Sequence, residues 1–147
     1  MPRQVKLSRL HRVIDANYNR AKEGLRVCED ICRFVRDDAK ATARFKELRH
    51  GLTAAVMVFG LKDMVASRDI TGDVGCKTIA AESRRRHVGD IFYANIQRVK
   101  ESLRVLEEFA KLENIEAAER FKSLRYKVYG LEKKAFERLQ AVSDPRR

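Results

Sequence analysis

Proline and glycine are scarce in this sequence, and long apolar runs are absent. The chain has 147 residues but only two prolines, Pro2 and Pro145, which lie at its ends, and seven glycines. Because proline and glycine interrupt helices, their scarcity favours long helices and predicts an all-α fold. No apolar run approaches the roughly 18 residues needed to cross a membrane, so we expect no membrane partner.

Cysteine is also rare, and the N-terminal sequence has no apolar core of a signal peptide. The three cysteines are Cys28, Cys32 and Cys76. An odd number without a secretion signal indicates free thiols and a cytoplasmic protein. Cys28 and Cys32 are spaced so that they could hold a metal ion. The second copy of the repeat described below has Leu106 and Ala110 there, so we interpret both cysteines as apolar core residues.

Acidic residues are outnumbered by basic ones. The chain has 32 Lys and Arg against 21 Asp and Glu, which gives a net charge of +11. Basic chains bind nucleic acid, anionic lipid or small phosphorylated molecules, and the charge alone does not choose among them. The hydrophobic content of 44% is enough for a core, and the length suits one domain over residues 1–147.

One segment of the sequence occurs twice. Residues 16–34 and 94–112 share nine identities in nineteen positions, and the run from Phe45 to Arg49 is answered by the run from Phe121 to Arg125. Chance would give about one or two identities in the first pair. We therefore predict a tandem duplication, with repeats over residues 13–66 and 91–143. Two copies favour a closed domain with a pseudo-twofold axis over a solenoid.

The apolar spacing predicts four long helices. They are expected over residues 11–36, from 39 to the mid-60s, over 89–112 with Asp90 as the N-cap, and over 115–142. Two long αα-hairpins follow, packed as an antiparallel helical bundle. Residues 67–89 form a charged connector that contains glycine, in which residues 78–86 could form a short helix. A connection this long is more often functional than idle.

Polar side chains stand on the apolar faces of the two repeated helices. On a helical wheel, Asn17 lies in the middle of the apolar arc, Arg20 lies about 60° away within it, and Glu23 lies at its edge. Asn95, Arg98 and Glu101 repeat this arrangement. Buried amides and charges are costly unless they are satisfied. Either they bond to backbone and buried carboxylates, which fixes the packing, or they face a polar cavity that binds a phosphorylated ligand.

The connector has some ingredients of a phosphate site. The run from Gly72 to Thr78 lacks the glycine spacing of a P-loop, so we exclude that motif. Its glycines and Lys77 could still cradle a phosphate, and Asp69 and Asp73 carry oxygen ligands of the kind that Mg²⁺ prefers. Alternatively, both aspartates simply form turns.

Several spaced motifs resemble one known family. They comprise the run from Ala94 to Val99, Glu101, residues 103–109, residues 124–129, residues 131–132 and, in the connector, Arg68, Asp69, Asp73, Gly75, Glu82 and Arg85. In this order they are similar to a domain found at the N-terminus of some thiamine-phosphate synthases, the monofunctional hydroxymethylpyrimidine-phosphate kinase. The resemblance covers about residues 13–134.

The resemblance implies an enzyme, a kinase whose acceptor is a phosphate group. It implies that ATP phosphorylates 4-amino-2-methyl-5-(phosphooxymethyl)pyrimidine to its diphosphate in thiamine biosynthesis, with Mg²⁺ and ATP as cofactors. On this hypothesis Asp69 and Asp73 hold the metal and form the catalytic set with Arg68. The residues expected to bind substrate are Asn17, Arg20, Glu23, Asn95, Arg98, Glu101 and Arg85.

Two other functions stay open at this stage. The chain could be a helical adaptor that binds a phosphorylated pyrimidine or thiamine-phosphate synthase without catalysis. It could also be a basic bundle that binds nucleic acid, although inward-facing Asn and Arg side chains favour a small ligand and no nucleic-acid partner. Broad apolar arcs on long hairpins often bury surplus area in a dimer, so we expect a homodimer.

Overall fold

The computed structural model describes residues 3–77 and 80–142, and every regular element in them is helical. The α-helices are α1 (Arg3–Asp30), α2 (Ala39–Val56), α3 (Leu61–Ala66), α4 (Val88–Ala110) and α5 (Ile115–Val142). A π-helix, η1 (Ile31–Val35), continues α1, and two short 3₁₀ helices, η2 (Met57–Phe59) and η3 (Ala80–Ser83), complete the set. The predicted all-α fold is confirmed.

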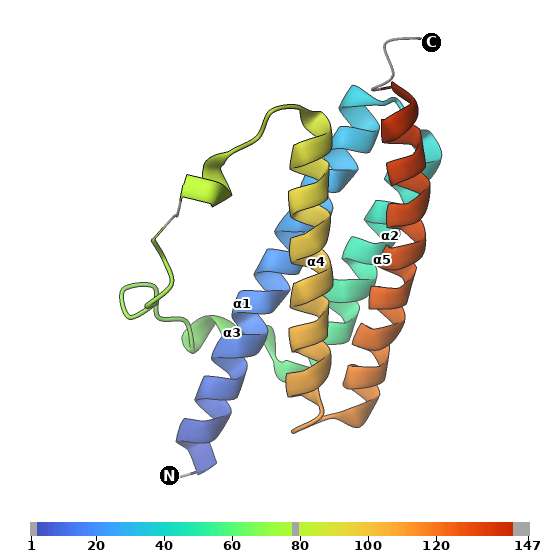
Figure 1. Cartoon of the computed structure of the whole chain (residues 1–147). Coiled ribbons are helices and arrows are strands. Elements are labelled where there is room, and N and C mark those ends of the chain that lie inside the picture. The colour runs from blue at the N-terminus through green and yellow to red at the C-terminus, as the bar shows by residue number, and fades with distance from the viewer. Residues whose placement is uncertain (1–2, 78–79, 143–147) are drawn as a thin grey trace.

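The four long helices pack side by side as an antiparallel bundle (Figure 1). Helix α1 contacts both α2 and α4, and α5 contacts the same two helices from the other side. The connector between α3 and α4 extends away from the bundle on the left of the view. None of the helices in the described ranges is both long and apolar enough to span a membrane.

Three of the predicted helices differ from the structure in a boundary, in continuity or in length. Helix α1 begins at Arg3, earlier than residue 11. The second helix is not continuous, because Gly60 adopts φ +77° and separates η2 from α3. Glycine enters this left-handed region without the steric penalty of a Cβ atom, so it ends helices readily. In the segment 78–86 only η3 is helical, and Thr78 and Ile79 lie outside the described residues.

The N-cap of α4 is His87 rather than Asp90. The backbone N–H of Asp90 donates to Nδ1 of His87 at 3.3 Å. The Asp90 carboxylate instead accepts hydrogen bonds from the backbone N–H and the Nε of Arg86, each at 3.1 Å. The prediction failed because an imidazole nitrogen can accept the same hydrogen bond that a carboxylate would at this position.

The core of the bundle is filled by large apolar side chains from all four long helices. Phe45 of α2 packs edge to face on Phe92 of α4, with ring centroids 6.1 Å apart. Cys28 and Cys32 are buried among these residues as free thiols, which confirms their apolar interpretation. Burial raises the pKa of the Cys28 thiol, and it raises that of Cys32 to about 11, so neither is a thiolate at neutral pH.

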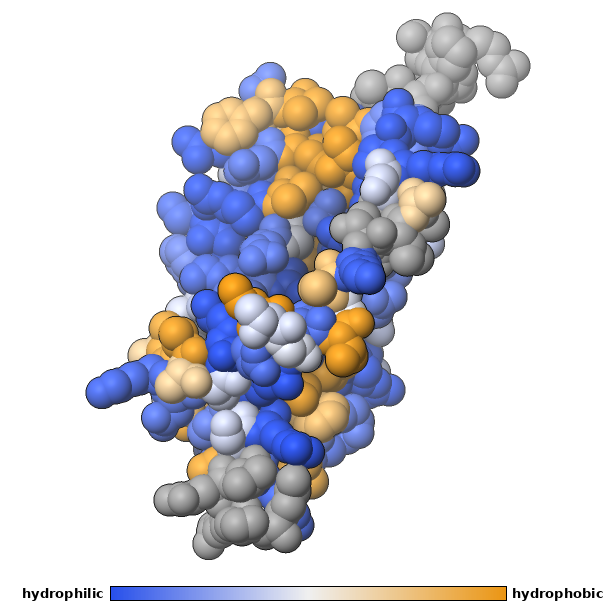
Figure 2. Space-filling view, turned by 90° about the vertical axis from the view of Figure 1, so that its left-hand side faces the viewer, coloured by the Kyte–Doolittle hydropathy of each residue, from blue (hydrophilic) through white to orange (hydrophobic). Residues whose placement is uncertain are grey.

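Apolar surface gathers at the end of the molecule where η1 lies. Phe34 and Val35 of this π-helix are 65% and 57% exposed. Figure 2 shows an apolar patch at the upper end of the molecule, the end that holds η1 and the start of α4. Such a patch is a candidate interface with another chain. The expected homodimer remains a prediction.

Candidate functional site

A groove of about 460 Å³ runs between α1 and α4. It is lined by Asn17, Arg20, Glu23 and Gly24 from α1 and by Asn95, Arg98, Glu101, Ser102 and Val105 from α4. All six repeat residues that were predicted to bind substrate from these two helices therefore line one groove. Sequence reasoning did not single out Gly24, Ser102 and Val105 as site residues, although on a helical wheel they lie next to the residues that were predicted.

The two helices can approach closely because one of them carries a glycine at the crossing. A Cβ atom at Gly24 would lie 2.8 Å from Cγ2 of Val99 and 3.0 Å from the backbone oxygen of Asn95. The counterpart of Gly24 in the repeat is Ser102, another small residue, which is 3% exposed. Small residues at the crossing leave the larger polar side chains on either side of it to form the walls of the groove.

Both asparagines are buried and are held by their own helices. Nδ2 of Asn17 donates to the backbone oxygen of Val13 at 2.9 Å, and Nδ2 of Asn95 donates to that of Ile91 at 2.8 Å. Within residues 3–77 and 80–142 neither Oδ1 accepts a hydrogen bond. The prediction that these side chains bond to backbone is therefore right for the amide nitrogens. The amide oxygens belong to residues that line the groove, and they remain acceptors for a ligand.

The charged residues of the groove lie at its rim. Arg20 and Arg98 are exposed, which corrects the prediction that they lie within the buried arc. A helical wheel gives the direction of a side chain but not its length, and an arginine near the edge of the arc extends its guanidinium into solvent. Arg20, Arg98, Glu23 and Glu101 form no ion pair with any other described residue.

Neighbouring charges on the same helices are paired. Glu29 is 3% exposed and accepts from Nε of Arg49 at 2.8 Å, and Glu107 is 4% exposed and lies 2.9 Å from Nη2 of Arg125. Arg49 and Arg125 thus each cross to a carboxylate of the neighbouring helix and do not line the groove. The unpaired charges of α1 and α4 that line the groove are thus available to bind a charged molecule.

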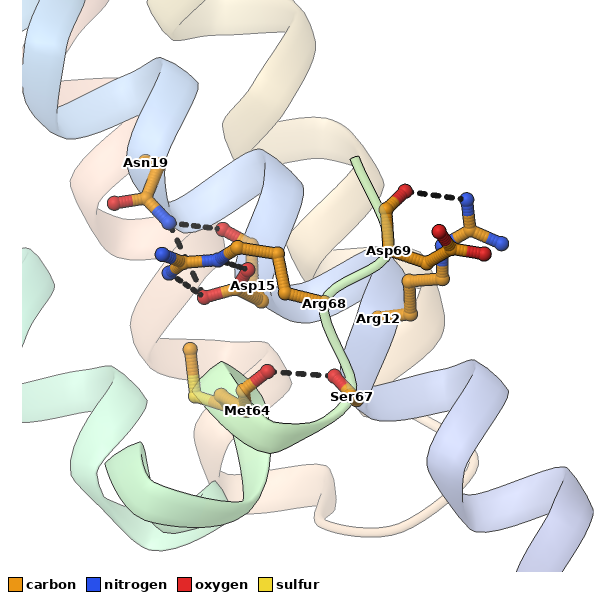
Figure 3. Close-up of polar contacts among 7 residues, drawn as sticks. All are labelled: Arg12, Asp15, Asn19, Met64, Ser67, Arg68 and Asp69. Carbon is orange, nitrogen blue, oxygen red and sulfur yellow. Dashed lines mark hydrogen bonds and ion pairs between the residues drawn. The ribbon is translucent and has the colours of Figure 1, made fainter. Parts of the chain in front are cut away.

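The predicted residues of the connector do not line the groove. Arg68 donates from Nε and Nη2 to the two carboxylate oxygens of Asp15, both at 2.8 Å (Figure 3). Arg85 is half-buried and donates from Nη1 to the backbone oxygen of Arg84 at 2.8 Å. Sequence reasoning missed Asp15, because the repeat has no matching acidic residue that could have drawn attention to it.

Asp69 and Asp73 both stabilise turns. Oδ1 of Asp69 accepts from the backbone N–H of Gly72 at 2.9 Å, and Oδ1 of Asp73 accepts from that of Gly75 at 2.9 Å. The hydrogen bond from Gly72 holds the pKa of Asp69 below its usual value. Among the described residues no three His, Cys, Asp or Glu side chains are grouped to hold a metal ion. Two exposed carboxylates fit Mg²⁺ only if a ligand's phosphate oxygens supply further contacts.

Known proteins match this chain over most of its length. The profile of the ThiD2 family matches residues 12–134. A protein of Thermosynechococcus vestitus named thiamine-phosphate synthase is 42% identical over 125 residues, which cover 84% of this chain and 34% of that protein. A protein of Synechocystis sp. with the same name is 41% identical over 138 residues, 90% of this chain and 39% of that protein.

The chain therefore spans little more than a third of the length of these two relatives. A third protein with the same name, from Rhodopirellula baltica, is 39% identical over 119 residues, 80% of this chain and 32% of that protein. No solved structure matches.

Proposed function

Because this chain belongs to the ThiD2 family, we propose that it is a kinase of thiamine biosynthesis that uses ATP to phosphorylate 4-amino-2-methyl-5-(phosphooxymethyl)pyrimidine to its diphosphate. The similarity to proteins named thiamine-phosphate synthase supports a role in the same biosynthesis. Since the chain covers only about a third of those proteins, the activity in their name is not transferred to it.

One observation carries the proposal. Two buried amides and four charged side chains that form no ion pair with the other described residues line a single groove, and they are drawn from corresponding positions of two helices. An arginine guanidinium donates to phosphate oxygens in a fixed fork, so Arg20 and Arg98 suit the phosphate groups. The Oδ1 atoms of Asn17 and Asn95 suit the exocyclic amino group of the pyrimidine, with Glu23 and Glu101 as further acceptors.

The proposed chemistry places modest demands on the protein. An oxygen of the substrate's phosphate forms a bond to the γ-phosphorus of ATP, the bond from that phosphorus to the bridging oxygen breaks, and ADP leaves. The attacking oxygen is already ionised, so no strong base is required. Positioning and the neutralisation of charge supply most of the catalysis of such a transfer. Mg²⁺ would neutralise phosphate charge, held by Asp69 and Asp73 together with phosphate oxygens.

The decisive experiment incubates the protein with Mg-ATP and the monophosphate and measures ADP and the diphosphate by chromatography. A double variant, Arg20→Met with Arg98→Met, is expected to lose about 10²-fold or more in kcat/KM, because developing charge on the phosphates loses two donors. The control is Arg26→Met, which removes an exposed arginine of α1 outside the groove and is expected to retain activity.

Two outcomes would overturn the proposal. The first is full turnover by a correctly folded double variant, which would show that the groove is not the site. The second is the absence of any diphosphate, and if calorimetry then still detects binding of the monophosphate, the adaptor function replaces the kinase. Binding to DNA or RNA that falls steeply with salt would instead favour the nucleic-acid function.

A further inference from the structure

Each internal repeat supplies the groove with the same set of polar side chains. An asparagine is followed three residues later by an arginine and six residues later by a glutamate. The groove is lined by both sets, which are Asn17, Arg20 and Glu23 of α1 and Asn95, Arg98 and Glu101 of α4. We refer to them as the α1 half-site and the α4 half-site. The duplication thus provides one set of ligand-binding groups twice within a single groove.

The two half-sites lie end to end along the groove. Helices α1 and α4 run in opposite directions (Figure 1), and a Cβ atom at Gly24 of α1 would lie 3.0 Å from the backbone oxygen of Asn95. Asn17 precedes Gly24 by seven residues, so at a rise of about 1.5 Å per residue the two asparagines lie about 10 Å apart along the groove. Each arginine follows its asparagine on a helix that runs toward the other half-site, so Arg20 and Arg98 lie between the two asparagines. The groove therefore has an amide toward each end and two guanidinium groups between them.

Both amides are held so that the oxygen atom is left to accept a hydrogen bond. Nδ2 of Asn17 and Nδ2 of Asn95 donate to backbone oxygens of their own helices, which fixes the orientation of each amide. An amide oxygen accepts from an exocyclic amino group, whereas a ring carbonyl at that position offers it no hydrogen. Asn17 is 5% exposed and Asn95 is 9% exposed, so the wrong partner leaves a buried acceptor unsatisfied. Each half-site therefore selects a ring with an amino group and, beside it, a phosphate.

The two substrates of the proposed reaction share this chemistry. The acceptor is a 4-aminopyrimidine that carries a phosphate. The donor, ATP, carries a triphosphate and adenine, whose six-membered ring is also a pyrimidine with an exocyclic amino group. Placed phosphate to phosphate, the two molecules have amino groups at their outer ends and phosphates in the middle. This is the order in which amides and guanidinium groups follow one another along the groove.

We propose that the two half-sites bind the two substrates, one ring at each asparagine, with their phosphates meeting at Arg20 and Arg98. This inference rests on the proposed kinase function. The phosphate oxygen of the monophosphate then lies next to the γ-phosphorus of ATP, which is the orientation that direct transfer with loss of ADP requires. The phosphates of the two substrates repel each other, and the two guanidinium groups between the asparagines offset this repulsion.

The first test measures binding and does not depend on turnover. Calorimetry is carried out with the monophosphate alone and with the non-hydrolysable analogue β,γ-imido-ATP alone. Asn17→Ala and Asn95→Ala are each expected to weaken one ligand about tenfold or more and to leave the other within about twofold, and the weakened ligand should differ between them. Where an alanine variant does not fold, the leucine variant of the same asparagine, which is closer to it in size, replaces it.

An asparagine of α1 outside the groove provides the matched control. Nδ2 of Asn19 donates to the backbone oxygen of Asp15 at 2.9 Å, the same bond to its own helix that Asn17 makes. Asn19→Ala should bind both ligands as the parent chain does. Saturation with the monophosphate should leave binding of the ATP analogue non-competitive, because the two ligands occupy different half-sites.

The second test measures donor specificity, which a merely structural role of the asparagines would not change. GTP has a ring carbonyl where ATP has its amino group, so kcat/KM should be at least about tenfold higher with ATP than with GTP. In one of the two asparagine variants this preference should shrink toward one, while the other variant keeps it. An equal loss with both nucleotides in both variants would contradict the assignment of adenine to one amide.

The outcomes separate this inference from the kinase function. If the parent chain forms no diphosphate, the proposed function fails, while calorimetry still shows whether two aminopyrimidine ligands occupy separate half-sites. If the parent chain is active but both variants weaken the same ligand, or the monophosphate displaces the analogue, one ligand fills the groove and the division into half-sites is refuted. Normal binding of both ligands in both folded variants places neither ring at an amide and refutes it as well.

Discussion

At Gly24 a single missing methyl group sets the distance between the two helices of the groove. The nearest atoms to a Cβ at this position are a side-chain methyl of Val99 and the backbone oxygen of Asn95. The methyl can move, but a backbone oxygen in the middle of a helix cannot move without displacing α4. Because Asn95 is also a wall of the groove, the spacing at Gly24 affects both stability and the site.

We expect Gly24→Ala to destabilise the protein by about 1–3 kcal/mol, the usual cost of overpacking, despite the better helix propensity of alanine. Urea unfolding measures the change. Gly130 of α5 is the matched control, since a Cβ there meets nothing within 4 Å. Gly130→Ala should therefore stabilise by about 0.5–1 kcal/mol. If the two variants behave alike, the close approach at Gly24 does not constrain the fold.

The internal repeat allowed most residues of the groove to be predicted from the sequence. Residues whose position the repeat does not reveal could not be predicted. A polar residue at the same place in two copies is conspicuous, so Asn17, Asn95 and the charges near them could be found. The exposure of Arg20 and Arg98 could not be predicted, because a helical wheel gives the direction of a side chain but not how far it extends toward solvent. The burial of Asp15 could not be predicted either, since it depends on an ion pair with Arg68. Arg68 is distant in the sequence, and no regular spacing links the two residues.

Helix α2 begins with a charged cap, and α5 begins with a neutral one. Oδ1 of Asp38 accepts from the backbone N–H of Ala41 at 3.0 Å, and Oδ1 of Asn114 accepts from that of Ala117 at 3.0 Å. The hydrogen bond from Ala41 lowers the pKa of Asp38, and Arg138 lowers it further. The geometry of the two caps is thus the same, while only one of them titrates.

This difference predicts a pH dependence. A carboxyl whose pKa falls on folding stabilises the folded state above its unfolded pKa of about 3.9, and it loses that contribution as pH falls through the folded value. Asp38→Ala should therefore cost about 1 kcal/mol at neutral pH and progressively less below pH ~4. Asn114→Ala should cost a similar amount at every pH. Parallel losses for both variants in urea unfolding at neutral and acidic pH would contradict this account.

At the scale of the elements, apolar periodicity identified the four long helices but not all of their boundaries. Gly60 is one of seven glycines, and nothing in its neighbours marks it as the one that ends a helix. The break depends on α3, whose Met64 is 1% exposed and packs into the core. Tertiary packing of this kind selects among glycines that are equivalent on local criteria, and a periodicity argument has no access to it.

For the whole molecule, the main consequence is that the groove is complete within one chain. Its lining residues come from α1 and α4 of the same bundle. If a homodimer forms, its interface is therefore not required to assemble the groove, and we expect each chain to carry its own site.

This arrangement can be tested by mixing two inactive variants. Arg20→Met removes one guanidinium of the groove, and Arg98→Met removes the other. Mixed and allowed to exchange subunits after mild denaturation and refolding, they should stay as inactive as either variant alone, because no chain contains both arginines. If the site were instead shared between subunits, random pairing of the two variants would give up to about a quarter of the sites both arginines. Recovery of diphosphate formation in the mixture would therefore place the site between chains.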